Sequence, residues 1–248
     1  MHELLLSLGG LLAGMINTLA GNGTVITMSL CTEIIGLSPS IANGTNRLGV
    51  LTQSITGSYG LYKRKKLLLQ GTYQAMECMM AGAILGIWIA TVINDAMFRK
   101  IYPWFLVFVF VVLILRPERW LKPATDLDYK PPFYIWFIYF LVGIYGGLIQ
   151  LGVGVFFLAA TIMLHRLPWS HANAAKIFVV GLFTIIAVIV FSRKGLFDLH
   201  TAIFLAIGQS LGAWLAVRYL HHLPQAHKIS YYILLAVTGA TILKQFLW

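Results

Sequence analysis

Charged side chains are scarce in this chain. They make up 10% of its 248 residues, while hydrophobic residues make up 59% and the mean hydropathy is +0.82. A soluble globular domain carries about 25% charged residues and about 45–50% apolar ones. So few charges exclude an ordinary water-soluble fold, because the chain lacks the polar surface to cover itself. Lipid is therefore the expected solvent.

Catalytic and metal-binding motifs are also lacking. The sequence contains no HExxH, no GxSxG, no P-loop and no run of histidines at metal-ligand spacing. Its two cysteines, Cys31 and Cys78, lie in apolar stretches without a CxxC pattern. We therefore expect no enzymatic reaction, no cofactor and no metal.

The net charge of +10 does not indicate a nucleic-acid partner. The basic residues stand mostly between apolar segments, where they determine membrane topology. The densest cluster, residues 63–66, reads Lys-Arg-Lys-Lys and is expected in the cytoplasm.

The apolar segments follow a pattern that occurs twice. Residues 4–36, 39–62, 67–94 and 101–115 are long, medium, medium and short, and so are residues 133–164, 168–192, 199–217 and 229–243. This order predicts an all-α polytopic membrane protein of two related halves. The first transmembrane repeat would span residues 1–115 and the second residues 133–248, joined by a cytoplasmic linker at residues 116–132.

The first segment of each half has an awkward length. Each exceeds 30 residues, roughly 48 Å as a helix, which is too long for one straight span and too short for two spans with a turn. Glycines interrupt both, at residues 20–24 in one and at residues 146–147 and 152–154 in the other. We expect a broken or re-entrant segment in each half, followed by about three transmembrane helices. Close helix packing through small residues is the alternative explanation for these glycines.

Broken segments in matching positions of two halves are typical of a transporter binding site, because irregular backbone inside a membrane must face protein or a water-filled cavity. The sequence leaves two topologies open. If each broken segment crosses the membrane once, the halves are parallel; if each returns, they are inverted.

Four charged side chains fall inside apolar segments: Glu33, Arg47, Glu77 and Lys176. Each costs about 2.5–3.5 kcal/mol to insert even on the lenient scale, so a function is expected. Arg47 stands eight residues after Pro39, and Lys176 eight after Pro168, which puts each cation about 12 Å into its helix.

Two cations at related depths predict a site for a small anion, and an oxyanion suits a guanidinium best. Amides on the same helical faces would add hydrogen bonds, and the N-termini of the broken helices would add backbone N–H groups. The predicted substrate-binding residues are Arg47, Lys176, Asn43, Asn173, Asn17, Gly21, Asn22, Gly23, Thr24, Asn46, Gln150, Gly152 and Gly154.

Structural explanations for the charged residues stay open. Arg47 could form an ion pair with Glu77, and Lys176 could extend to the nearer membrane surface. Glu77 is the candidate for proton coupling, with a plain counter-ion as the alternative. Glu33 is expected near an interface.

Residues 10–23, with residues 42–47 reading Ala-Asn-Gly-Thr-Asn-Arg, resemble the TauE/SafE sulfite exporter family. A looser second copy follows at residues 152–154 and 172–176. The resemblance implies a two-repeat protein of the cytoplasmic (inner) membrane that transports small sulfur-containing anions, namely sulfite, sulfonates such as sulfoacetate, or thiosulfate. Asn22 departs from the all-glycine run that family members often show, which affects the expected substrate.

The leading hypothesis is a secondary transporter with alternating access, whose partners are a small anion and the membrane lipids. An anion channel using the same cations is the alternative. A membrane-embedded enzyme lacks a nucleophile–base pattern. The direction of transport, a coupling proton or other ion, and assembly into a homo-oligomer are left open by the sequence.

Overall fold

The computed structural model describes residues 2–93 and 131–219 continuously, together with residue 129 and single residues within 96–114 and 232–243. The described residues form helices and no strand. In the first half these are α1 (His2–Leu19), α2 (Thr24–Ser29), the π-helix η1 (Leu30–Ile34), α3 (Pro39–Lys63) and α4 (Tyr73–Val92). In the second half they are α6 (Tyr134–Leu148), α7 (Val153–Ala159), the π-helix η3 (Ala160–Leu164), α8 (Trp169–Arg193) and α9 (Leu199–Arg218).

Four of these helices, α1, α4, α8 and α9, are long and apolar enough to cross a membrane. Helix α3 has 25 residues, roughly 37 Å, and so has the length to cross as well. Its polar side chains lower its hydropathy, but most of them are buried against other helices, including Asn43, Asn46, Arg47 and Gln53. The chain is thus a multi-pass helical membrane protein, as its composition predicts.

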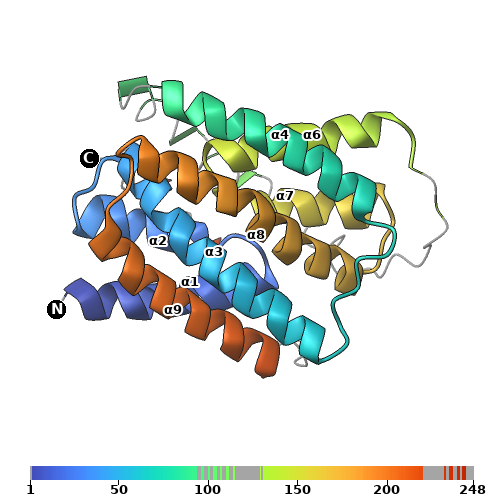
Figure 1. Cartoon of the computed structure of the whole chain (residues 1–248), viewed down its shortest axis with the longest axis horizontal. Coiled ribbons are helices and arrows are strands. Elements are labelled where there is room, and N and C mark those ends of the chain that lie inside the picture. The colour runs from blue at the N-terminus through green and yellow to red at the C-terminus, as the bar shows by residue number, and fades with distance from the viewer. Residues whose placement is uncertain are drawn as a thin grey trace.

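The first broken segment is a re-entrant hairpin. Helices α1 and α3 both run parallel to α9, since contacts advance together along each pair: Ser7 with Gly208, Leu11 with Gly212, Asn46 with Gln209, and Gly60 with Val217. Because α1 and α3 run in the same direction, α2 and η1 must return the chain to the side on which α1 began. Figure 1 shows this return, with α1 starting beside the N-terminus and α2 leading back toward the start of α3.

The second broken segment is also a hairpin, and it enters from the opposite side. Helices α4 and α6 are parallel, with Gly82 facing Phe140 and Gly86 facing Ile144. Helix α8 runs antiparallel to α3, with Ser54 beside Gly181 and Arg47 stacked on Phe191. Matched helices of the two halves therefore run in opposite directions, which favours the inverted topology over the parallel one (Figure 1). The duplication itself stays a prediction.

Glycine pairs with GxxxG spacing hold two of the helix pairs together. Helix α1 packs on α9, and α4 packs on α6. The glycines at these contacts are Gly10 and Gly14 in α1, Gly82 and Gly86 in α4, Gly143 and Gly147 in α6, and Gly208 and Gly212 in α9. A Cβ built at Gly86 would lie 2.0 Å from the Ile144 carbonyl oxygen, so only glycine fits. In lipid such close backbone approach replaces hydrophobic burial as the source of association.

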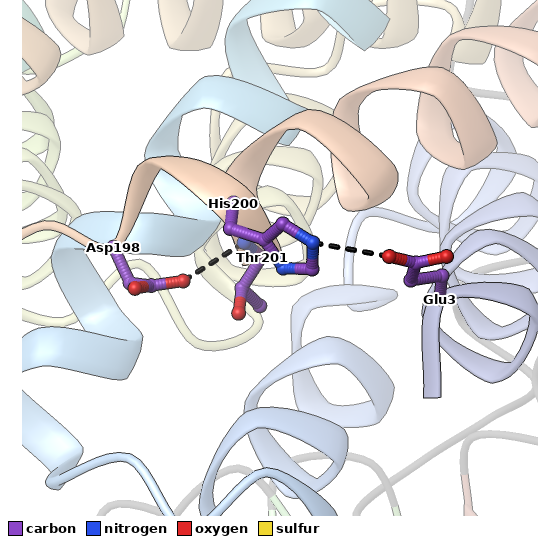
Figure 2. A network of polar contacts seen from close by, with 4 residues as sticks. All are labelled: Glu3, Asp198, His200 and Thr201. Atoms are coloured by element: carbon purple, nitrogen blue, oxygen red, sulfur yellow. Dashed lines mark hydrogen bonds and ion pairs between the residues drawn. The ribbon is translucent and has the colours of Figure 1, made fainter. Parts of the chain in front are cut away.

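Polar caps fix the starts of α3 and α9. The Ser38 hydroxyl accepts from the Ile41 N–H, with Pro39 as first helical residue, as the sequence predicts. The Asp198 carboxylate accepts from the Thr201 N–H at 2.8 Å (Figure 2). Hydrogen bonding by the Thr201 side chain, and then by its backbone N–H, lowers the pKa of Asp198. In the same first turn, His200 contacts the Glu3 carboxylate at 3.1 Å and so ties α9 to the start of α1 (Figure 2).

Exposed cations gather at the end of the bundle where α3 and α9 finish and α8 begins. They are Lys63, Arg64, Lys65, Arg166 and Arg218, with the half-buried Lys66 beside them. The opposite end carries Glu3, Glu33 and Asp198 beside Arg193 and Lys194. By the positive-inside rule we expect the cationic end in the cytoplasm. Most of the predicted linker, residues 116–132, lies outside the described residues.

Replacing Gly86 with leucine should destabilise the bundle by about 1–3 kcal/mol or more, because the side chain would force α4 away from α6. The test is the apparent melting temperature in detergent. Ala81→Leu is the matched control, since Ala81 lies on the exposed face of the same helix. Equal melting temperatures for the two variants would contradict the packing described.

Replacing Asp198 with alanine should cost about 1 kcal/mol, because the first turn of α9 loses its cap. Since the pKa of Asp198 is lowered in the folded protein, the carboxylate stabilises the fold above its unfolded pKa. That contribution is lost as pH falls through the lowered folded pKa. Melting curves of the wild type and Asp198→Ala should therefore converge in acid. A difference that grows as pH falls would show that the ionised carboxylate does not stabilise α9.

Candidate functional site

The two hairpins meet at their glycine-rich turns. The Gly154 N–H donates to the Gly21 carbonyl at 3.1 Å, and Gly21 has a φ of +86°. A Cβ built on Gly21 would lie 2.6 Å from the Gly154 Cα, so side chains are excluded at both positions. The backbones of the two re-entrant segments therefore touch where each reaches its deepest point.

The second turn contains an unusual backbone at Gln150. Its φ is +59°, in the left-handed region that few residues other than glycine adopt. Its side-chain amide donates to the Thr184 hydroxyl at 2.9 Å, which anchors the turn to α8. Gly152, two residues later, is also left-handed, with φ +63°. The break thus falls at residues 149–152, whereas Gly146 and Gly147 lie inside α6, where Gly147 packs on α4.

Arg47 caps the buried C-terminus of α6. Its guanidinium is fully buried and donates to the carbonyls of Gly146 at 2.9 Å and Gly147 at 2.7 Å. Asn43, one turn earlier on α3, donates to the Leu148 carbonyl at 2.8 Å and accepts from Arg47 at 3.3 Å. Together the two side chains satisfy the last three carbonyls of the helix.

Lys176 caps the C-terminus of α1 in the corresponding way. Its ammonium donates to the carbonyls of Asn17 at 2.9 Å and Thr18 at 3.2 Å. Asn17 and Thr18 are the third-last and second-last residues of α1. Gly146 and Gly147, which Arg47 binds, hold the same two positions in α6. Each cation therefore comes from one half and caps the broken helix of the other.

The sequence analysis expected the two cations, together with backbone N–H groups of the broken helices, to surround a small anion. In the structure both cations donate hydrogen bonds to the carbonyl ends of helices. A buried helix C-terminus presents unpaired carbonyls and about half a negative charge, and a cation satisfies both. The structural role of Arg47 is therefore explained without a substrate.

The two acidic residues lie away from this centre. Glu77 is exposed on α4 and Glu33 is exposed on η1. The hydrogen bonds of Arg47 go to carbonyl oxygens and to Asn43, so the structure gives no support to a buried Arg47–Glu77 pair. Lys176 is 2% exposed and points to α1, so it does not extend to the membrane surface. Proton coupling through Glu77 stays a prediction.

A small polar cavity lies between the hairpins, α3 and α8. Its volume is about 10 Å³, which corresponds to a single water molecule. Its polar lining consists of Asn17, Thr24, Gln53, Ser54, Gln150 and Lys176. The Asn17 amide donates to Gln53 at 3.2 Å, whereas the Ser54 hydroxyl and the side-chain amide oxygen of Gln150 are buried without a protein partner. Lys176 is the one charged residue in the lining.

The other predicted residues lie beside the cavity or behind it. Gly154 also lines it, while Gly21 and Gly152 shape the turns. Asn46 accepts from Gln209 of α9 at 3.0 Å and so joins α3 to α9. Gly23 packs on α1, and Asn22 is fully buried with both polar side-chain atoms unpartnered.

Asn173 is buried on α8 outside this lining. Sequence reasoning did not select Ser54 or Gln53 for the site, although Gln53 stands out as an uncharged polar residue in a membrane segment.

A family model described as "Sulfite exporter TauE/SafE" matches residues 6–242. The chain belongs to this family. The predicted resemblance is thereby confirmed, and a membrane transporter, not an enzyme, is the class of protein that the family describes.

Relatives of this TauE/SafE member carry the same class of name. The probable membrane transporter protein ORF9 of a Sinorhizobium species is 27% identical over 212 residues, which cover 84% of this chain and 79% of the relative. The probable membrane transporter protein YfcA of Escherichia coli K12 is 24% identical over 208 residues, covering 84% and 77%. No solved structure matches the chain.

Replacing Arg47 with methionine should destabilise this TauE/SafE member strongly, because the Gly146 and Gly147 carbonyls would be left buried and unpaired at about 1–3 kcal/mol each. The readout is the apparent melting temperature in detergent. Lys63→Met, which removes an exposed cation from the end of the same helix, is the control. A loss no larger than that of the control would contradict the capping role.

Proposed function

We propose that this chain is a secondary transporter that carries small sulfur-containing anions, such as sulfite, sulfonates or thiosulfate, across the cytoplasmic membrane by alternating access. The observation that supports this most is the buried polar cavity between the two hairpins, which holds a single cation. Alternating access needs a polar site that can be closed from both sides, and the polar residues that line this cavity are all buried.

Lys176 is the residue proposed to attract the anion. An ammonium has three N–H donors, and the α1 carbonyls accept from two of them. The third is available to a ligand in the cavity that Lys176 lines. Neutral donors stand around it, including the Asn17 and Gln53 amides and the Ser54 hydroxyl, so an oxyanion could exchange its water for protein hydrogen bonds.

Arg47 has a different proposed role. Its guanidinium donates hydrogen bonds to the C-terminal carbonyls of α6, and Arg47 does not line the cavity. Its proposed role is therefore to hold the second hairpin in place. Asn43 supports the same task. Of the two cations predicted to bind substrate, Lys176 is the one we place in contact with it.

The hairpins provide a means of alternating access. They enter from opposite sides and touch through the Gly154–Gly21 hydrogen bond. The cavity is too small for a sulfur oxyanion in this closed form, so binding requires the surrounding helices to separate. Movement at the α1–α2 hairpin would open the cavity to one side and movement at the α6–α7 hairpin to the other.

The proposal predicts that purified protein in proteoliposomes takes up radiolabelled sulfite with saturation, and that Lys176→Met reduces uptake by at least about a hundredfold, because a buried anion would lose its one cation. Lys63→Met should transport like the wild type, since Lys63 is exposed at the end of α3.

Two results would count against the proposal. Full uptake by Lys176→Met would remove this lysine from the site. Non-saturating conductance in planar bilayers, without exchange of anions across the membrane, would indicate a channel in place of a transporter.

A further inference from the structure

The cavity has one unit of positive charge to offer a ligand. Among its eleven lining residues only Lys176 is ionisable, and the residues contributed by α1, α2, α3, α7 and the second turn are all neutral. Arg47 lies on α3 two turns before Ser54, roughly 10 Å along the helix, and its donors are directed to α6. The positive charge available at the cavity is therefore that of a single ammonium.

Burying a charge without a partner is strongly unfavourable in a medium of low dielectric constant. A monovalent anion placed beside Lys176 forms a neutral pair. A divalent anion leaves one negative charge without a counter-charge, and the carbonyl end of α1, which faces Lys176, would repel it further.

The neutral part of the lining points to a hydrogen-bonded ligand. The Ser54 hydroxyl has no partner, although Ser54 is 2% exposed and lines the cavity. A buried hydroxyl without a partner is unusual in native proteins and calls for an explanation. An oxygen atom of an anion held by Lys176 would provide that partner.

We infer that the cavity selects monovalent oxyanions, held by the ammonium of Lys176 and the hydroxyl of Ser54, over divalent ones. The inference rests on the proposed transport function and narrows it. Hydrogen sulfite and monovalent sulfonates fit the site, whereas sulfoacetate and thiosulfate, which are divalent at neutral pH, do not.

The test is competition against sulfite uptake in proteoliposomes at neutral pH. Isethionate (2-hydroxyethanesulfonate) and sulfoacetate both have two carbons and a sulfonate group. They differ at the terminal carbon, which is a CH2OH group in isethionate and a carboxylate in sulfoacetate. The pair therefore tests the effect of the second negative charge at nearly constant size. Isethionate should inhibit at a concentration at least about ten times lower than sulfoacetate. If sulfoacetate inhibited sulfite uptake as strongly as isethionate or more strongly, the selection for monovalent anions would be overturned, while the proposed transport of sulfite would stand. Absence of sulfite uptake by folded wild type would overturn the proposed function and this inference with it.

The role of Ser54 is tested with Ser54→Ala. Because the hydroxyl has no protein partner, its removal should leave the melting temperature unchanged while it raises the KM for sulfite by about two- to tenfold. Ser58→Ala, one turn later on α3 and outside the cavity lining, is the control and should change neither. An unchanged KM in Ser54→Ala, or the same change in Ser58→Ala, would remove Ser54 from the anion site.

Discussion

The structure depends on how two helices can end inside a membrane. A helix C-terminus presents carbonyls that lack intrahelical partners, and the hydrocarbon region has no water to supply them. Arg47 and Lys176 supply the missing donors, each reaching from one half of the chain to the broken helix of the other. The cost of burying two cations is thus offset by satisfying two helix ends, and the halves are linked in the process. The irregular backbone that a polar site requires can then exist between them.

Close packing around this centre comes from glycine and not from large apolar side chains. The pairs Gly10 and Gly14 in α1 and Gly82 and Gly86 in α4 bring their helices against the backbones of α9 and α6. Helices α3 and α8, which carry the two cations, lie between these pairs (Figure 1). Helices α1 and α6, the first helices of the two hairpins, are therefore each held by close backbone packing against an outer partner, α9 or α4.

Much of this architecture follows from the sequence. The low charge content predicts a membrane protein, and the 20–24 glycine-rich stretch predicts the first break at the place where the structure has it. The interval between Arg47 and Pro39, repeated at Lys176 and Pro168, predicts two cations at matching depths. The inward-facing polar residues of α3, such as Asn43 and Gln53, are recognisable because polar side chains are rare in such segments.

Other features depend on contacts between distant parts of the chain, which the sequence does not display. Nothing local shows that Arg47 points at carbonyls 99 and 100 residues away or that its charge is used there. The same limit applies to Gly146 and Gly147, whose glycine pattern fits a helix break and a helix contact equally well. The direction of the hairpins is likewise shown only by contacts between distant residues, such as Ser7 with Gly208. The parallel and inverted topologies have the same residue spacing, so the sequence does not distinguish them.

The central claim is that the cavity beside Lys176 is an anion site open to each side in turn. Its most direct test is the labelling of Gln53→Cys by a membrane-impermeant thiol reagent, in a Cys31→Ala, Cys78→Ala background, with the reagent supplied from either side. Since Gln53 lines the cavity, we predict labelling from both sides and protection by sulfite. Labelling that occurs from one side only, or that sulfite leaves unchanged, would contradict the account.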